Sequence, residues 1–359
     1  MKTTKQRVVV GVSGGIDSAM TAHLLLNQRY EVIGVTMATH DPNSQLTIKQ
    51  GCLSPVNRTE IALAKDLCDK LGIKHYVIEI GSEFNRIVLE YFRDVFLKGK
   101  TPNPCVFCNK EIKFELLPKK IRELGIEFDY YATGHYVRLI KDNDDYLLAK
   151  GADPTKDQSY FLSRIDPKIL PHILLPLGDY YKREIREMAE LNGFKELAKK
   201  SESQDFIEQE DYLQVFANNE YKSGDIVDSS GKTIGKHRGV IFYTVGQRKG
   251  LNLSGLPEPY YVLRIDNCTN SIVAGPKSEL YSSYLVAEEV SWLYEHKINR
   301  ELPLEAKIRF HHTPSRCVIN KLENNCYEVE FATPQMAITP GQTIAFYQGE
   351  ILLGGGIIK

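Results

Sequence analysis

The sequence predicts an α/β domain with a parallel sheet over about the first 200 residues, followed by antiparallel strands in a sandwich or small barrel. Before residue 200, continuous apolar runs alternate with segments of helical periodicity, as in sheets covered on both faces. After it, short alternating stretches are broken by Gly, Pro and Asn, which is typical of antiparallel strands. We therefore place one domain boundary near residues 199–200 and a softer one near residues 274–277.

The expected elements follow one another in a regular order. Short apolar runs predict strands over residues 7–12, 31–37, 75–80 and 130–133. Apolar residues three or four apart predict helices over residues 18–26, 59–71, 84–97 and 110–124. Later in the chain, alternation predicts strands at 260–264, 306–310 and 327–331. Three consecutive glycines in residues 353–358 either let a last strand bend or leave a flexible end.

Composition limits the class of protein. The 359 residues and 40.8 kDa fit two or three domains. Lys plus Arg number 45 and Asp plus Glu 46, and the net charge of −1 excludes a uniformly basic nucleic-acid binder. Because no uncharged apolar stretch approaches about 18 residues, we expect no signal peptide and no membrane span. Seven scattered cysteines favour reduced thiols in a cytoplasmic protein.

A glycine-rich loop joins the first expected strand to the first expected helix. It consists of Gly11, Val12, Ser13, Gly14, Gly15, Ile16, Asp17 and Ser18. Glycines let backbone N–H groups approach an anion closely, and a helix N-terminus adds partial positive charge. The loop lacks the lysine of a Walker A motif and the glycine spacing of the dinucleotide fingerprint. It predicts a different kind of phosphate site; the alternative is a plain turn with Ser or Asp as N-cap.

Residues 13–18, Ser-Gly-Gly-Ile-Asp-Ser, resemble the pyrophosphate loop of ATP-dependent adenylating enzymes. Five further motifs follow in order: Thr-Pro-Asn-Pro-Cys-Val-Phe-Cys-Asn-Lys at 101–110, Ala-Thr-Gly-His-Tyr-Val-Arg at 132–138, Lys-Asp-Gln-Ser-Tyr-Phe-Leu at 156–162, Thr-Val-Gly-Gln-Arg-Lys-Gly at 244–250 and Thr-Pro-Gly-Gln at 339–342. Over nearly the whole chain, this series resembles the tRNA-specific 2-thiouridylase family.

The resemblance implies three domains. Residues 1–200 would form a Rossmann-like, adenine-nucleotide-binding catalytic domain, residues 201–275 a small mixed central domain, and residues 276–359 an antiparallel β-barrel that contacts tRNA. The implied reaction is ATP-dependent 2-thiolation of the wobble uridine in the tRNA anticodon stem-loop, with ATP and Mg²⁺. The uracil C2 oxygen is first adenylated, because it is otherwise a poor leaving group, and sulfur then attacks C2 and releases AMP.

The resemblance also assigns roles to individual residues. Besides the loop, Met37 and Gly134 would line the adenosine site, and Asp17 would help to hold Mg²⁺ unless it is a solvated N-cap. Contacts with the tRNA are implied for seven positions besides the catalytic helix, and Asn103, Pro104 and Cys105 would hold the flipped-out target base. The other contacts would be made by Lys156, Asp157, Gln158, Arg309 and Phe310. We expect a structural role for His135.

The sulfur chemistry is implied to depend on Cys108, which stands at the family's catalytic cysteine and which we expect just before a helix that lowers its pKa. Many family members have Asp at the position of Cys105 and a second Cys at that of Asp205, so the usual disulfide cannot form here. One hypothesis is a persulfide–disulfide route through Cys105 and Cys108, fed by a persulfide-delivering sulfur carrier. The other is a [4Fe–4S] cluster held by Cys105, Cys108 and Asp205, which would accept inorganic sulfide.

Two rival interpretations remain. Another adenylating enzyme of the same superfamily would act on a small metabolite and would need no RNA. A non-catalytic RNA-binding protein or iron–sulfur sensor would consume no ATP, although the intact loop at residues 13–18 speaks against it.

Overall fold

The computed structural model describes residues 5–41, 57–199, 212–216, 221–295, 298 and 302–359. The chain divides into two compact units. The first consists of Met1–Ile87, Phe107–Gln214 and Glu350–Leu352, and the second of Val88–Val106, Val215–Gly349 and Leu353–Lys359.

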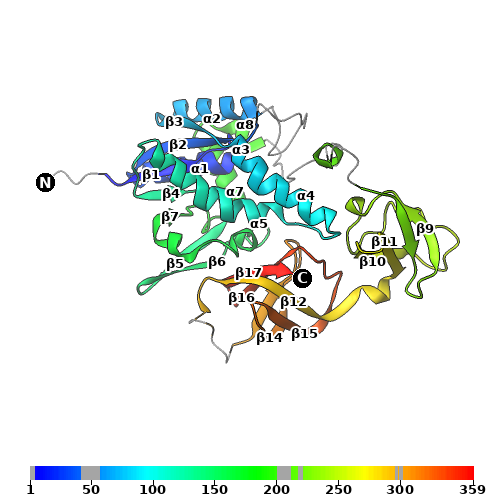
Figure 1. Cartoon of the computed structure of the whole chain (residues 1–359). Coiled ribbons are helices and arrows are strands. Elements are labelled where there is room, and N and C mark those ends of the chain that lie inside the picture. The colour runs from blue at the N-terminus through cyan, green and yellow to red at the C-terminus, as the bar shows by residue number, and fades with distance from the viewer. Residues whose placement is uncertain (1–4, 42–56, 200–211, 217–220, 296–297, 299–301) are drawn as a thin grey trace. The chain divides into compact units, whose positions relative to one another are not determined.

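A five-stranded parallel sheet forms the centre of the first unit (Figure 1). Its strand order is β3-β2-β1-β4-β7, with β1 at Arg7–Gly11, β2 at Glu31–Ala38, β3 at Lys74–Glu79, β4 at Tyr130–Ala132 and β7 at Ile173–Leu174. The side chains of Val8, Val9 and Val10 are fully buried in β1, as expected of a strand covered on both faces. The parallel sheet predicted from the apolar runs is therefore confirmed.

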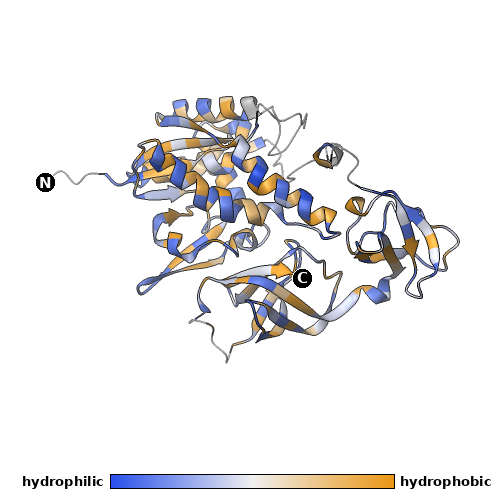
Figure 2. Ribbon diagram, in the orientation of Figure 1, coloured by the Kyte–Doolittle hydropathy of each residue, from blue (hydrophilic) through white to orange (hydrophobic). Residues whose placement is uncertain are grey.

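Three helices pack against one face of this sheet. They are α1 (Ile16–Asn27), α2 (Asn57–Leu71) and α7 (Lys182–Leu191), and α8 (Lys195–Lys199) follows the last of them. One apolar cluster joins Val8 of β1, Met20 of α1, Leu67 of α2 and Ile185 of α7. Hydrophilic and hydrophobic residues alternate around the helices, as Figure 2 shows, so burial of one face holds each helix to the sheet.

Two longer helical runs contain π-helical turns. In the first, α3 (Gly81–Phe84) passes through a π-helix at Asn85–Leu89 into α4 (Glu90–Leu97). In the second, α5 (Pro104–Cys108) continues through a π-helix at Asn109–Leu116 into α6 (Leu117–Glu123). The predicted helices at 84–97 and 110–124 are confirmed, but the second run begins six residues earlier than expected, at Pro104.

A hairpin of β5 (Val137–Asp142) and β6 (Asp145–Lys150) follows β4 in the first unit. Its strands are antiparallel, and Ala149 of β6 pairs with Ile351. Short 3-10 helices at Ser159–Leu162 and Pro167–His172 lead from the hairpin to β7. We did not predict this hairpin, which positions the 132–138 and 156–162 motifs at the edge of the sheet where β1 and β2 end.

The second unit contains two antiparallel β structures. A four-stranded sheet has the order β10-β11-β8-β9, with β8 at Gly224–Val227, β9 at Thr233–His237, β10 at Tyr260–Asp266 and β11 at Ser271–Pro276; only β8 and β11 pair in parallel. Short 3-10 helices occur at Tyr212–Phe216, Val240–Phe242 and Lys277–Leu280. These strands form the expected small central domain.

The C-terminal strands close into a barrel, as expected. They are β12 (Tyr281–Trp292), β13 (Leu304–Lys307), β14 (Ser315–Lys321), β15 (Tyr327–Met336), β16 (Thr343–Gln348) and β17 (Ile351–Ile358), and pairing of β17 with β12 completes the circle. Gly354 has a φ of 152°, and the register shifts opposite it in β12. The glycine-rich tail is thus a bent strand, and the alternative of a flexible end is wrong.

Among the described residues, no helix is both long and apolar enough to cross a membrane.

Candidate active site

The loop between β1 and α1 has a backbone that requires glycine. Gly14 has a φ of 74°, and a Cβ on it would lie 3.0 Å from the Leu63 Cβ and 3.1 Å from the Glu60 carbonyl oxygen. Gly15 is the N-cap of α1, and no side chain caps this helix end. The alternative of a plain turn capped by Ser or Asp is therefore wrong. The first N–H groups of α1 have no side-chain acceptor, which suits an anion.

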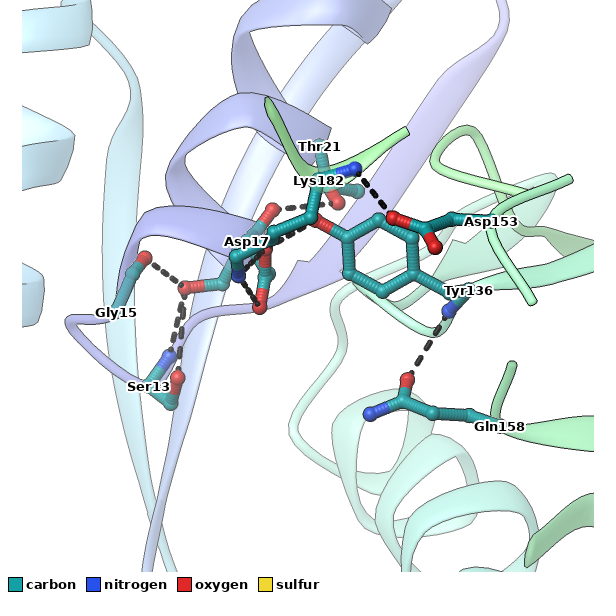
Figure 3. A network of polar contacts seen from close by, with 9 residues as sticks. Ser13, Gly15, Asp17, Thr21, Tyr136, Asp153, Gln158 and Lys182 are labelled. Carbon is teal, nitrogen blue, oxygen red and sulfur yellow. Dashed lines mark hydrogen bonds and ion pairs between the residues drawn. The ribbon is translucent and has the colours of Figure 1, made fainter. Parts of the chain in front are cut away.

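Ser18 braces the loop from inside. Its hydroxyl accepts a hydrogen bond from the Ser13 N–H at 3.2 Å and donates one to the Gly15 carbonyl at 3.0 Å (Figure 3). The Ser18 side chain is buried. The loop therefore keeps its shape without a bound ligand, and a preorganised loop loses little conformational entropy when phosphate binds.

Asp17, in the first turn of α1, is the centre of a network of polar contacts. The Lys182 ammonium donates to both of its carboxylate oxygens, at 2.7 and 2.8 Å, and the Tyr136 hydroxyl donates to one of them at 2.7 Å (Figure 3). The Lys182 side chain is 6% exposed and that of Asp17 is 29% exposed. The alternative of a solvated N-cap aspartate is wrong, because Asp17 is half-buried and paired.

Lys182 is held in place from its own backbone. It is the first residue of α7, which begins with a capping box of Tyr181 and Glu184. The Lys182 N–H donates to the Asp153 carboxylate at 3.0 Å. Although burial alone would raise the pKa of Asp153, bonds from Thr155 and from this N–H keep it below its usual value. An ionised Asp153 thus fixes the start of α7, and the ammonium of Lys182 lies 5.4 Å from the Tyr136 ring centroid.

The segment expected to contact tRNA is joined to the same network. Gln158 accepts a hydrogen bond from the Tyr136 N–H at 3.0 Å through its side chain and donates its own N–H to the Tyr136 carbonyl at 3.1 Å. The Asp157 carboxylate accepts N–H bonds from Gly151 and Ser159. Two of the three residues at 156–158 therefore shape the backbone, and Tyr136 connects this segment to Asp17 of the loop.

The two residues expected at the adenosine site lie near the same sheet edge. Met37 is half-buried at the carboxyl end of β2, which neighbours β1. Gly134 follows β4, and a Cβ on it would lie 3.0 Å from the Asp17 backbone carbon. A side chain at 134 would therefore push against the loop. Ligands of open parallel sheets bind at this edge.

Cys108 ends α5 and is buried beneath β4. Burial and the neighbouring Cys108 raise the pKa of Tyr131, a buried residue of β4. The Tyr131 hydroxyl in turn lies 3.1 Å from where a Cβ on Gly11 would be, at the start of the loop. Tyr131 therefore separates the sulfur of Cys108 from the phosphate loop by the width of one aromatic ring.

The structure corrects the expected position of the cysteines in their helix. The helical run starts at Pro104, so Cys105 lies in its first turn and Cys108 one turn further on. The helix N-terminus therefore favours a thiolate at Cys105 and not at Cys108, as we had expected. Lys110 forms an ion pair with Glu111 at 2.7 Å. The i, i+3 spacing places Cys105 and Cys108 on one face of α5.

His135 has a structural role, as expected. Its Nδ1 lies 2.7 Å from the Thr133 hydroxyl, and its ring lies against Phe114 with centroids 5.8 Å apart. Burial, with a smaller effect of Lys113, lowers the pKa of His135 to about 3. His135 is thus neutral at physiological pH and supplies no proton.

This neutral histidine makes stability depend on pH. Between pH 3 and 6.5 the unfolded chain binds a proton at His135 that the folded chain does not, so stability falls as pH falls through this window. We expect the unfolding midpoint of the wild type to drop more between pH 7 and 5 than that of His135→Gln, by an amount equivalent to roughly 1 kcal/mol. Parallel pH shifts in thermal melts of the two proteins would contradict this assignment.

Three of the motifs meet within the second unit. The Gln342 side-chain amide donates to the Thr101 and Pro102 carbonyls at 3.3 and 3.0 Å, and the hydroxyls of Thr101 and Thr244 are hydrogen-bonded. Asn103 then accepts the Val106 N–H at 3.2 Å and caps α5. The motifs at 244–250 and 339–342 thus hold the segment that leads into the cysteine helix.

The remaining predicted residues are placed less directly. Arg309 and Phe310 follow β13, where the Arg309 guanidinium donates to the Met336 carbonyl at 2.9 Å and Phe310 is half-buried. Asp205 lies outside the described residues. Sequence reasoning missed Lys182 and Asp153 altogether. Tyr136 stands inside the 132–138 motif, but nothing in its spacing indicated a contact with Asp17.

A parallel sheet with a glycine loop and a helix N-terminus after its first strand defines an α/β nucleotide-binding protein of the adenylating class. Three family models match consecutive parts of the chain: a tRNA methyl transferase HUP domain over residues 6–209, a tRNA methyl transferase PRC-barrel domain over 210–276, and an aminomethyltransferase β-barrel domain over 282–358.

Curated relatives are similar over the full length. The tRNA-specific 2-thiouridylase MnmA of Endomicrobium trichonymphae is 42% identical over 99% of both chains. That of Acetivibrio thermocellus is 41% identical over 99% of this chain and all of its own, and that of Carboxydothermus hydrogenoformans 42% identical over 99% and 98%. The chain belongs to the tRNA-specific 2-thiouridylase family.

Proposed function

We propose that this protein catalyses ATP-dependent 2-thiolation of the wobble uridine in tRNA. The observation that carries the proposal is the preorganised phosphate loop with its Asp17–Lys182 pair, one tyrosine away from the Cys108 sulfur. The loop suits ATP cleavage, and the cysteine suits sulfur transfer. Because thiol chemistry needs a reducing compartment, we place the reaction in the cytoplasm.

In the first step, the uracil C2 oxygen attacks the α-phosphate of ATP, and pyrophosphate leaves. The N–H groups of residues 14–18 stabilise the negative charge of the departing pyrophosphate. Within the described part of the chain, no group of three His, Cys, Asp or Glu side chains could hold a metal ion. Mg²⁺ commonly binds one or two carboxylates together with phosphates and water, so Asp17 fits as the single protein carboxylate beside ATP-bound Mg²⁺.

In the second step, a persulfide on Cys108, delivered by a sulfur carrier, attacks C2 through its outer sulfur and expels AMP. The Cys105 thiolate then attacks the Cys108 sulfur, which breaks the sulfur–sulfur bond, leaves 2-thiouridine and forms a Cys105–Cys108 disulfide. A thiol reductant returns both cysteines to the reduced form. Two observations support this division: Cys105 is the more exposed of the two and lies at the helix N-terminus.

The competing route is a [4Fe–4S] cluster that takes inorganic sulfide. Cys105 and Cys108 on one helix face fit two of its ligand positions, and Asp205 would supply the third. We derive no step through such a cluster, because only two of the three proposed ligands belong to the described residues.

Anaerobic purification followed by iron and sulfide analysis, visible absorption and a 2-thiouridine assay on unmodified tRNA separates the routes. Thiolation by a colourless, iron-free protein supports the dithiol route. Stoichiometric iron with broad absorption near ~400 nm, lost in Cys105→Ala, would establish the cluster instead. Absence of thiolation with every sulfur source, together with ATP cleavage that needs no RNA, would overturn the proposal in favour of an enzyme acting on a small metabolite.

A further inference from the structure

The four-stranded central domain, which the proposed reaction leaves without a task, contains a cavity of about 270 Å³. Two cationic side chains, Lys236 and Arg238, two aromatic ones, Phe242 and Tyr243, and the amide of Gln247 line it. This volume lies at the lower end for ligand pockets. The cavity therefore suits one flat group, such as a nucleobase, better than a large metabolite.

The cavity contains a stacked cation–aromatic pair. The Arg238 guanidinium carbon lies 4.0 Å from the centroid of the Phe242 ring, and Arg238 is exposed. Phe242 is fixed in turn by an edge-to-face contact with Tyr221, with centroids 5.0 Å apart. A planar guanidinium backed by an aromatic ring is a surface on which an unpaired base stacks.

The rim of the cavity is the 244–250 motif, and its loop is rigid. The Gln247 side chain accepts the Thr244 N–H at 3.0 Å and donates to the carbonyls of Phe242 and Lys249 at 3.3 and 2.9 Å. The Gly246 N–H donates to Val262 of β10 at 2.8 Å. Gln247 is thus used entirely for shaping the loop, which leaves Arg248 and Lys249 to face solvent.

The charges around the cavity favour an anion. Lys236 is paired with Asp225 at 2.5 Å. Arg238, Arg248 and Lys249 form no ion pair with any described residue. Three unneutralised cations beside a stacking surface match the phosphates and the base of a single-stranded nucleotide.

We propose that this cavity binds one unpaired nucleotide of the tRNA, with its base stacked on Arg238 and its flanking phosphates at Arg248 and Lys249. The identity of the RNA rests on the proposed function; the stacking site itself does not. The site would add affinity for RNA at a distance along the chain from the residues that carry the chemistry.

The test measures the dissociation constant of unmodified tRNA at several salt concentrations for wild type, Arg238→Gln, Arg238→Lys, the double variant R248Q/K249Q and Lys277→Gln. Lys277 is an exposed lysine of the same unit that does not line the cavity, so it controls for loss of one surface charge. We expect Arg238→Gln to bind about tenfold more weakly. Arg238→Lys should bind equally weakly, because an ammonium offers no plane for stacking.

The double variant should bind more weakly and lose roughly 0.7 of salt slope for each phosphate contact, whereas Lys277→Gln should match the wild type. Unchanged affinity of Arg238→Gln would overturn the site, and so would a wild type that binds no tRNA. Full binding by Arg238→Lys would overturn the stacking. Thiolation assayed in parallel separates the two proposals: weaker binding without any thiolation contradicts only the proposed function, and normal thiolation with unchanged binding contradicts only the nucleotide site.

Discussion

Cys108→Ser should abolish thiolation, by on the order of 10³-fold or more, while ATP binding and pyrophosphate release continue. A serine hydroxyl cannot carry a persulfide, so the second step has no sulfur to deliver. The phosphate loop makes its own hydrogen bonds and none of them involves Cys108, so the first step should persist. The measurement combines nucleoside analysis for 2-thiouridine with a pyrophosphate assay in the presence of tRNA.

Cys268→Ser is the matched control, because Cys268 is an exposed free thiol of the central domain. It should thiolate tRNA at the wild-type rate, which separates loss of the particular thiol from loss of a thiol in general. Retained thiolation by Cys108→Ser would remove Cys108 from the mechanism. Equal loss of pyrophosphate release would instead mean that the substitution had damaged the loop through Tyr131.

Lys182→Met should slow pyrophosphate release by roughly 100-fold or more. The substitution leaves the half-buried Asp17 carboxylate without its cation, and breaking one side of a buried pair costs about 3–5 kcal/mol. Asp17 would then turn away from the loop or take up a proton, and the phosphates would lose their positioned partner. Lys182 touches Asp17 and not the reacting atoms, so it is a positioning residue whose loss should lower kcat more than it raises the KM for ATP.

Two further variants separate positioning from simple destabilisation. Lys182→Arg keeps the charge and should restore part of the rate, whereas a merely structural effect would follow the melting temperature. In the double variant with Asp17→Asn, the unpaired charge is gone, so the rate should fall by less than the product of the single losses. Wild-type pyrophosphate release by Lys182→Met would show that the Asp17–Lys182 pair serves only the stability of α1 and α7.

The contacts of the second unit explain why distant motifs belong to one family pattern. The segment that leads into the cysteine helix has Thr244 and Gln342 as hydrogen-bond partners, although they lie 143 and 241 residues from Thr101 in the sequence. A hydrogen bond to a backbone carbonyl can be replaced by few side chains without leaving that carbonyl unsatisfied. These two motifs therefore support the chemistry by placing backbone, not by touching substrate.

The sequence by itself determined the parallel sheet, the loop after its first strand and the candidate cysteine, because each depends on local pattern: apolar runs, glycines at fixed spacing and a short motif. The β5–β6 hairpin escaped prediction, since its alternation is brief and lies between two recognisable motifs. The helix start at Pro104 was missed because Asn103 caps it from outside the apolar periodicity.

Only the tertiary structure decided what Asp17 does. Its partners Tyr136 and Lys182 are 119 and 165 residues away, on β4's following loop and on α7, and no local pattern relates them. Packing of α7 against α1 brings the ammonium to the carboxylate, and the resulting pair turns an apparent helix cap into the charged centre of the phosphate loop. In the same way, burial set the neutral state of His135, because the cost of desolvating a charge depends on neighbours that the sequence order does not specify.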